Sequence, residues 1–333
     1  MTDPTSPATT STMRAVVQDR YGTSEVLRPA EVPRPTIADH ELLLRVRAAG
    51  LDRGTEHLMT GKPYAVRLAV GLRAPRNPVP GRDLAGTVVA VGAAVTRFAV
   101  GDDVYGTASV SFAEYAAARE DKLARKPANL SFAQAAVVPV SGGTALQALL
   151  DVGGLQAGQS VLVLGASGGV GSYAVQIAKA FGAEVTGVCS AAKVDLVAAL
   201  GADHVIDYTR EDFAEGPARY DLILDIGGGA SLRRLRRALQ PRGTAVLVGA
   251  ENAGNLTGMG RQLRGALVSP LLHQRFVLLV AKERATHLER LTDLIEAGRI
   301  TPSIDRTFAL EDAAAAMRLL ESGQVRGKVA ITV

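Results

Sequence analysis

A short glycine-rich segment carries the clearest chemical signal in the chain. The apolar run VLVL at residues 161–164 leads into GASGGVG at residues 165–171 and then into helix-forming residues 172–179. The N–H groups at the start of such a helix are free to donate to an anion, and glycines let a diphosphate approach the main chain. This pattern predicts a dinucleotide whose pyrophosphate contacts Ser167, Gly168, Gly169 and Val170.

The spacing of the next strand favours a cofactor over the steric alternative, in which the glycines only make a tight turn. Residues 184–188 have the pattern of a strand that ends about 20 residues after the glycines, where the ribose of a dinucleotide is expected. An acidic side chain there would favour NAD. The chain instead has Cys189, Ser190 and Lys193, two of which can donate to a 2′-phosphate, so we predict NADP(H).

Two further side chains follow the third strand, which we expect at residues 204–207. Tyr208 could close over the same phosphate, and Arg210 would add a positive charge nearby. The alternative for both is an ordinary solvated position in a loop.

Composition limits the class of protein. A length of 333 residues suggests two domains, and 47% hydrophobic residues with 35 glycines are typical of a well-packed α/β protein. The net charge of +4 is scattered, and its densest basic run, RRLRR at residues 233–237, has the spacing of a solvated helix face. Aromatic residues are 4% of the chain and Trp is absent, so nucleic acid is not expected as the main partner.

Cysteine usage and apolar runs bear on the compartment. The single cysteine, Cys189, excludes an internal disulfide and a structural zinc site made of cysteines. Residues 1–12 are rich in Thr, Ser and Pro, which favours a disordered tail over a signal peptide. No apolar run is long enough to cross a bilayer, and residues 276–280 have only the length of a strand. We expect a cytoplasmic protein.

The chain divides into three segments by rhythm. Residues 13–130 hold short strands punctuated by glycine and proline, which predicts a mostly antiparallel, barrel-like domain with room for a substrate cleft. Residues 131–282 alternate helix and strand, and their six apolar strands predict a doubly wound α/β domain with a parallel sheet. Residues 283–333 are predicted to rejoin the first domain. Residues 56–71 and 251–264 show little pattern and are expected to be loops that line the substrate pocket. The six strands lie near Val161, Val185, Val205, Leu222, Ala245 and Phe276.

From Met13 to Val333 the chain resembles the medium-chain dehydrogenase/reductase superfamily, in particular its zinc-independent quinone oxidoreductase-like branch. The resemblance rests on the glycine turn together with PGRDLAGTVVAVG at residues 80–92, FAVGDDVYG at 98–106 and GADHVIDY at 201–208. It implies a GroES-like, mostly antiparallel β-barrel catalytic domain and a cofactor in the cleft beside the nucleotide domain. It also implies a homodimer that pairs edge strands, here residues 276–280.

The chain departs from the zinc-dependent branch of this superfamily at the metal ligands. Where zinc-dependent members carry Gly-His-Glu, this chain has Gly81, Arg82 and Asp83, and a guanidinium does not ligate zinc at neutral pH. Asp52 replaces a cysteine ligand, and no cysteine follows near Val140. The histidines, which fall in different elements without ligand spacing, are His40, His57, His204, His273 and His287. We therefore predict a site without catalytic zinc.

The same resemblance suggests catalytic residues. Tyr64 follows Gly61-Lys62-Pro63, where zinc-free relatives carry a tyrosine near the nicotinamide, although packing in a polar loop is the alternative. Asp52 and Arg53 occupy the positions of a former ligand and its neighbour, so they are candidates to line the pocket. Asp52 could equally form a structural ion pair with Arg53 or Arg82.

Further residues are candidates to contact the cofactor. Thr144 matches a family threonine near the nicotinamide or its phosphate, with helix capping as the alternative. Ile226, Val248 and Gly249 follow the fourth and fifth strands, where adenine and nicotinamide edges are expected. Lys328 could reach a cofactor phosphate, or could merely protect an edge strand from pairing.

The chemistry left without a metal selects the acceptor. Hydride transfer to a simple ketone builds an alkoxide, which needs a Lewis acid or a strong proton donor, whereas a quinone or an enone spreads the charge into a phenolate or enolate. The sequence thus predicts an NADPH-dependent, zinc-free reductase of quinones or α,β-unsaturated carbonyls. The alternatives are an NADP-dependent alcohol dehydrogenase, a 2-enoyl-thioester reductase, or an NADPH-binding protein that pairs with RNA or protein and turns over little.

Overall fold

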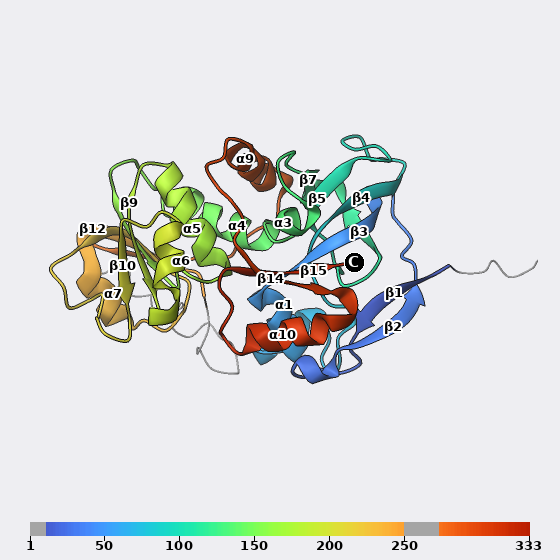
Figure 1. Cartoon of the computed structure of the whole chain (residues 1–333), viewed down its shortest axis with the longest axis horizontal. Helices are drawn as coiled ribbons and strands as arrows, with labels where there is room; N and C mark the ends of the chain where they lie inside the picture. Colours follow the sequence, from blue (N-terminus) through green and yellow to red (C-terminus); the bar gives the residue numbers. More distant parts are fainter. Residues whose placement is uncertain (1–10, 250–272) are drawn as a thin grey trace, which may run out of the picture.

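The structure, a computed structural model, describes residues 11–249 and 273–333. Its elements form two units side by side, one around a parallel sheet and the other around an antiparallel sheet (Figure 1). The pocket loop predicted at residues 251–264 and most of the predicted tail lie outside the described residues. Thr12, predicted to belong to that tail, is the first residue of a strand.

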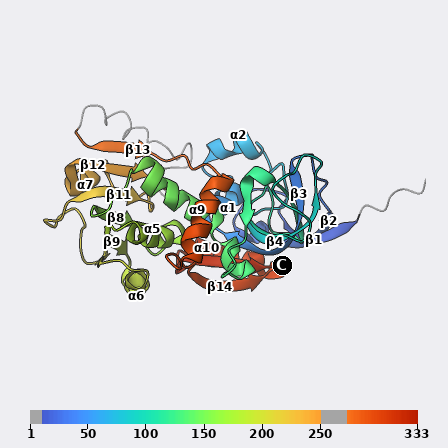
Figure 2. The same ribbon diagram turned by 90° about the horizontal axis from the view of Figure 1, so that it is seen from above.

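The parallel sheet confirms the predicted doubly wound architecture. Its strands follow one another in the chain order 3-2-1-4-5-6, which is the arrangement of dinucleotide-binding sheets (Figure 2). Across the sheet these strands are β10 (His204–Asp207), β9 (Glu184–Cys189), β8 (Ser160–Leu164), β11 (Tyr220–Asp225), β12 (Leu239–Leu247) and β13 (Arg275–Leu278).

Both faces of this sheet are covered, which explains why its strands are apolar along their whole length. In β8, Val161 and Val163 belong to the core that contains the buried residues of α5 (Gly169–Ala180). The alternating residues Leu162 and Leu164 belong to a second core, with Leu235 of α7 (Leu232–Ala238). Successive side chains of a strand point to opposite faces, so a strand between two helical layers has no polar side. A further helix, α6 (Val194–Ala199), follows β9.

The second unit is an antiparallel sheet extended by strands from the end of the sequence. A separate pair, β1 and β2, lies beside it. These strands are β1 (Thr12–Val17), β2 (Arg28–Pro33), β3 (Glu41–Leu51), β4 (Asp83–Val91), β5 (Asp103–Thr107), β6 (Tyr115–Arg119), β7 (Leu123–Arg125), β14 (Ile304–Ala309) and β15 (Lys328–Thr332).

The long strand β3 makes this sheet branch. Residues 41–45 of β3 pair with β6 and residues 48–51 pair with β15, while β4 runs along the opposite side. The order β14-β15-β3-β4-β5-β7 does not close on itself within the described residues, so the predicted barrel is an open sheet. Since β15 lies between β14 and β3, Lys328 does not enter an edge strand, and that alternative for its role is wrong.

Helices occupy the segment where the sequence predicted a pocket loop, residues 56–71. Asp52 caps the first of them, α1 (Arg53–Thr60), and Gly61 ends it in the left-handed conformation at φ 61°. A 3-10 turn (Tyr64–Val66) and α2 (Arg67–Val70) follow.

The two units share a core. One hydrophobic cluster contains Ala48 and Ala85 of the antiparallel sheet together with Val161 and Val185 of the parallel sheet. Helices α3 (Phe132–Ala136) and α4 (Pro139–Leu146) lie between them in the chain, and α9 (Ala285–Glu296) and α10 (Ala313–Glu321) complete the fold. The predicted boundaries at residues 130 and 282 stay predictions.

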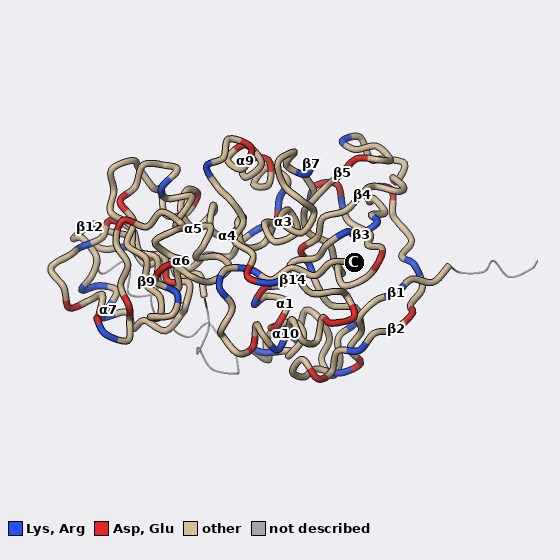
Figure 3. Tube along the Cα trace, viewed as in Figure 1, with Lys and Arg blue, Asp and Glu red and all other residues tan. Residues whose placement is uncertain are grey.

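Charged residues of both signs are scattered over the described part of the trace and do not gather in one stripe (Figure 3). The four arginines of α7 are exposed, as predicted for a solvated helix face. Of the helices described between residues 11–249 and 273–333, none combines the length and the apolar character required to cross a bilayer.

Candidate active site

The glycine turn joins β8 to α5 with the geometry of an anion site. Gly165 has φ +86°, a conformation that favours glycine, and Gly168 is the residue that precedes the first turn of α5. The first helical bond runs from the N–H of Ser172 to the carbonyl of Gly168 at 2.9 Å. At a helix start this leaves the N–H groups of Gly169, Val170 and Gly171 available to a ligand.

Strand register brings the other predicted cofactor residues to the same edge. Leu164, Asp225 and Leu247 are register partners across β8, β11 and β12. The residues that follow them, Gly165, Ile226 and Val248, therefore lie side by side. Gly249 also belongs here, where its main chain passes so close to the Ile226 carbonyl that a Cβ would lie 1.8 Å from that oxygen.

The predicted 2′-phosphate residues gather one strand further along the sheet. Cys189 and Asp207 are register partners at the ends of β9 and β10, which makes Ser190 and Tyr208 neighbours. Ser190 is half-buried and makes no capping hydrogen bond with its side chain, whereas Tyr208 is 62% exposed. Arg210 is exposed and lies 3.7 Å from the carboxylate of Asp207.

Lys193 is held beside these residues by main-chain carbonyls. Its Nζ donates to the carbonyls of Gly323 and Val325 at 2.9 and 2.8 Å. Burial lowers the pKa of Lys193, and the neighbouring Arg326 and Arg53 lower it further against the pull of Asp305. Arg326, which sequence reasoning missed, donates to the carbonyl of Ala192 at 3.0 Å and forms an ion pair with Asp195 at 2.7 Å, so it brings a second cation to this corner together with its carboxylate partner.

Lys328 lies beneath the glycine turn rather than at a surface. Its side chain is 1% exposed, and its Nζ donates to Ser141 Oγ at 2.9 Å and lies 4.0 Å from Asp83 Oδ2. A Cβ on Gly169 would be 3.0 Å from the Lys328 Cδ, and the N–H of Gly327 donates to the Ser167 carbonyl at 2.9 Å. β15 thus supports the turn from the side of the antiparallel sheet.

Asp83 is the buried acid of this cluster. Burial and, next, the nearby Asp52 carboxylate raise its pKa to about 8, against the opposing effects of Lys328, Arg82 and the N–H of Val140. Its Oδ1 accepts from the N–H of Val140 at 3.1 Å, which fixes the side chain against the start of α4.

A cavity of about 240 Å³ lies between the two units, and two of the predicted cofactor residues, Thr144 and Val248, line it. Thr144 is near the end of α4, so the capping alternative for it is wrong. Sequence reasoning missed the charged residues of the lining. They are Arg82, Lys122, Lys282, Glu283, Arg284 and His287.

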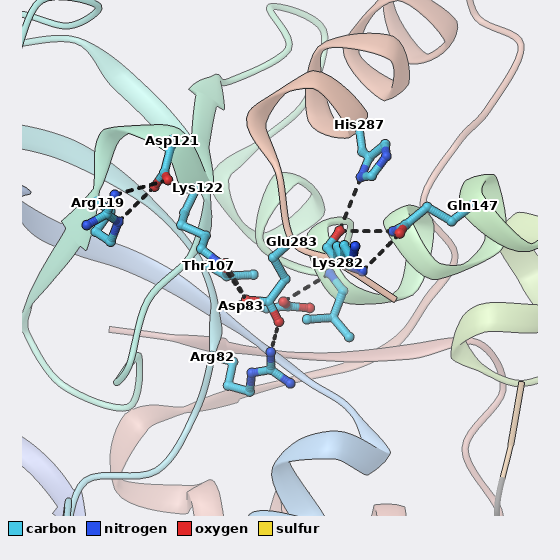
Figure 4. A network of polar contacts seen from close by, with 11 residues as sticks. Arg82, Asp83, Thr107, Arg119, Asp121, Lys122, Gln147, Lys282, Glu283 and His287 are labelled. Carbon is cyan, nitrogen blue, oxygen red and sulfur yellow. Dashed lines mark hydrogen bonds and ion pairs between the residues drawn. The ribbon is translucent and has the colours of Figure 1, made fainter. Parts of the chain in front are cut away.

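Glu283 is the centre of the polar contacts in the cavity (Figure 4). It forms an ion pair with Arg82, accepts from Thr107 Oγ1 at 3.1 Å, and lies 3.6 Å from Lys122 Nζ. These partners come from the ends of β4 and β5 and from the turn before β7, so their proximity follows from sheet pairing and not from spacing along the chain.

Gln147 fixes the segment that carries Glu283. Its amide donates to the carbonyl of Lys282 at 3.1 Å and accepts from the N–H of Lys282 at 2.9 Å. The side chain therefore pairs with the main chain as a neighbouring strand would, and it joins α4 to the residues before α9.

We predict that Gln147→Met lowers the free energy of unfolding by about 1–3 kcal/mol, because two partly buried hydrogen bonds to the N–H and carbonyl of Lys282 are lost. Urea unfolding measures the effect. Gln324→Met, at an exposed residue, is the control and should change it by less than about 0.5 kcal/mol. Equal stabilities of the two variants would contradict the role given to Gln147.

The three predicted catalytic residues do not line the cavity. Asp52 accepts from the N–H of Thr55 at 2.7 Å and so caps α1, which replaces the ion pair considered from the sequence. Arg53 pairs with Glu56. Tyr64 is 44% exposed and lies under the Arg67 guanidinium, 4.8 Å from the ring centroid. Their catalytic roles stay predictions.

A doubly wound sheet with a glycine turn suited to a phosphate, joined to an antiparallel unit across a small polar cavity, is the arrangement expected of two-unit oxidoreductases that use a nicotinamide cofactor. Comparisons with known proteins narrow this class. Residues 38–148 match the model of the alcohol dehydrogenase GroES-like domain, and residues 200–331 match that of the zinc-binding dehydrogenases.

Three similar proteins are oxidoreductases by name. The chain is 35% identical to 2-methylene-furan-3-one reductase of Solanum lycopersicum over 98% of this chain and 81% of that protein. It is 34% identical to the chloroplastic NADPH-dependent alkenal/one oxidoreductase of Arabidopsis thaliana over 96% and 79%. The structure of the quinone oxidoreductase from Coxiella burnetii has a TM-score of 0.86 at 30% identity and covers 97% of this chain and 100% of that one.

The chain belongs to the medium-chain dehydrogenase/reductase superfamily, in its quinone oxidoreductase-like branch, and is an oxidoreductase. The predicted membership is confirmed. One of the two matched family models is named for zinc-binding dehydrogenases. The residues at this chain's metal-ligand positions do not fit zinc, since Arg82 forms an ion pair with Glu283 and Asp52 caps a helix. The described residues contain no group of three or more metal-ligating side chains.

Proposed function

We propose that this chain is an NADPH-dependent, zinc-free reductase of quinones or α,β-unsaturated carbonyls. One observation carries the proposal: the cavity that contains Thr144 and Val248 from the cofactor edge is lined on its other side by the N–H donors of Arg82 and Lys122. The activities named for the tomato and Arabidopsis relatives support the same acceptors.

The residues of the chain divide the work. The bound cofactor supplies a hydride. Arg82 and Lys122 can donate hydrogen bonds to the oxygen on which negative charge develops as an enolate or phenolate forms. Glu283 holds both cations in place, and the small cavity limits the water around them.

The choice of NADPH rests on the corner around Ser190. Ser190 and Lys193 can donate to a 2′-phosphate, and Arg326 and Arg53 add positive charge beside them. The carboxylate of Asp207 at the end of β10 is engaged by Thr209, whose N–H and hydroxyl donate to it at 3.0 and 2.8 Å. The carboxylate of Asp207 is therefore hydrogen-bonded within its own loop.

We predict that Lys193→Ala raises the Kd for NADPH by about 10- to 100-fold, the loss of one charge-assisted hydrogen bond, and leaves the Kd for NADH nearly unchanged. Fluorescence titration with each cofactor measures both. NADH is the internal control, because Lys193 also joins two loops. Equal losses for the two cofactors would show that the lysine only supports the fold.

The proposal includes a cytoplasmic homodimer. Within the described residues β13 is at one edge of the parallel sheet, where a second copy could add its own strand. The interspersed charges give no support to an RNA partner.

Steady-state oxidation of NADPH with a panel of acceptors tests the proposal. Quinones and enones should be reduced faster than simple ketones by at least about tenfold, because they spread the developing charge. Preferred turnover of a ketone would indicate an alcohol dehydrogenase, and of a thioester an enoyl-thioester reductase. Binding of NADPH without turnover of any acceptor would indicate a binding protein.

A further inference from the structure

Some of the cationic side chains that line the cavity have no anionic partner among the described residues. Among the described residues, four cationic side chains, Arg82, Lys122, Lys282 and Arg284, line it against one carboxylate, that of Glu283. Glu283 already interacts with Arg82 and Lys122. The remaining lining side chain that can titrate, His287, lies 3.2 Å from Asp151, which is not part of the lining.

Lys282 and Arg284 are the cations left over. Within residues 11–249 and 273–333 neither side chain forms an ion pair or a hydrogen bond, and both residues are exposed at the mouth of the cavity. Their main chain is nevertheless fixed, because Gln147 holds Lys282 on both its N–H and its carbonyl. The two cations flank Glu283 in sequence and therefore enter the site from a positioned segment.

The cofactor does not account for this charge. Its pyrophosphate is assigned to the turn at Gly168 and Gly169, and its 2′-phosphate to the corner of Ser190 and Lys193, and none of these residues lines the cavity. Thr144 and Val248, which do line it, are assigned to the nicotinamide end. The unpaired cations thus face the space left for the acceptor.

We infer that this cavity selects acceptors that carry a carboxylate beside the reducible enone or quinone group. This inference rests on the proposed function and names the substrate class of the same site. Cations in a cleft attract an anion more strongly than they would in open water, since low-dielectric walls focus their field. A cavity of about 240 Å³ further favours a small acceptor over a bulky one.

A matched pair of acceptors tests the inference. In 6-oxohept-4-enoate and its methyl ester, two methylene groups separate the carboxyl group from the enone, so the intrinsic reactivity of the alkene is the same. We expect kcat/KM for the acid to exceed that for the ester by at least about tenfold at low salt. The advantage should shrink as salt is added, because salt screens exposed charges.

The double variant Lys282→Gln/Arg284→Gln assigns the effect to the two cations. The ratio of kcat/KM for acid and ester should fall to about one, through KM for the acid. Arg233→Gln, which removes an exposed arginine of α7, is the control and should leave the ratio as it is.

Each outcome has one meaning. Reduction of the ester without preference for the acid overturns the inference and leaves the proposed function intact. A double variant that raises KM for NADPH instead of KM for the acid also overturns it, because the cations then serve the cofactor. If no quinone or enone of either kind is reduced, the proposed function fails and the inference fails with it.

Discussion

Gly171→Ala is expected to abolish tight binding of NADPH and to destabilise the fold. A Cβ at this position would lie 2.1 Å from the carbonyl oxygen of Gly165 and 2.7 Å from the Cα of Ala166, both main-chain atoms that cannot rotate away. Alanine favours a helix over glycine by about 1 kcal/mol, but overpacking of this kind costs about 1–3 kcal/mol or more. The overlap therefore outweighs the propensity.

The start of α5 must then move away from β8 and take its N–H groups with it. We expect the Kd for NADPH to rise by more than about 100-fold, since a displacement of about 1 Å is enough for such a loss. Urea unfolding measures the first effect and calorimetric titration with NADPH the second. A variant with the stability and affinity of the unchanged chain would show that helix and strand are not packed as described.

Gly168→Ala tests cofactor binding with little effect on stability. A Cβ here would meet only the Gly165 carbonyl at 3.5 Å, an ordinary contact, and Gly168 has φ −86°, which alanine adopts freely. Loss of a glycine before the helix costs no more than about 1 kcal/mol. The methyl group would occupy the space assigned to the pyrophosphate, so NADPH should bind at least about tenfold more weakly. Unchanged affinity would place the pyrophosphate elsewhere.

The second large effect concerns Asp83. We expect the free energy of unfolding to fall as the pH rises, and we expect Asp83→Asn to remove this dependence. The pKa of Asp83 is about 8 in the folded chain and starts from 3.8 in an exposed state, so between these values the folded chain holds a proton that the unfolded chain has released. The free energy of unfolding must then decrease as pH rises, by up to about 1.4 kcal/mol per pH unit.

The asparagine variant keeps the shape and an acceptor for the N–H of Val140 but has no proton to lose. Its stability relative to the original chain should therefore rise steadily between about pH 5 and about pH 7. Urea unfolding across this pH range measures the difference in the free energy of unfolding between the two proteins. Groups that titrate alike in both proteins do not contribute to this difference. Parallel pH profiles would mean that Asp83 is already ionised, held so by Lys328.

Sequence patterns predicted the parallel unit well because its signals are local. The apolar runs, the glycine turn and the helix after it each lie within a few residues, and the order of strands follows from right-handed crossovers. Ile226, Val248 and the glycine turn could be placed at one edge for the same reason, since parallel strands end together.

The cavity was not predictable in this way. Arg82, Lys122 and Glu283 are far apart in the chain, and only the pairing of β4, β5 and β7 brings the first two near the third. The edge-strand alternative for Lys328 was wrong because an isolated lysine at a strand start gives no sign that another strand will cover it. Tyr64 rested on alignment with relatives, which does not determine where a short helical turn points.

The position of β15 has a consequence for how the molecule folds. Ala49 of β3 pairs with Ile331 of β15, and the whole parallel unit lies in the stretch of chain between them. A search across so long a loop is slow, whereas strands that are neighbours in sequence find each other quickly. We therefore expect the pairing of β15 with β3 to form later than the local pairings of β3, β4 and β5, so that the antiparallel sheet becomes complete only after the chain between these two strands has become compact.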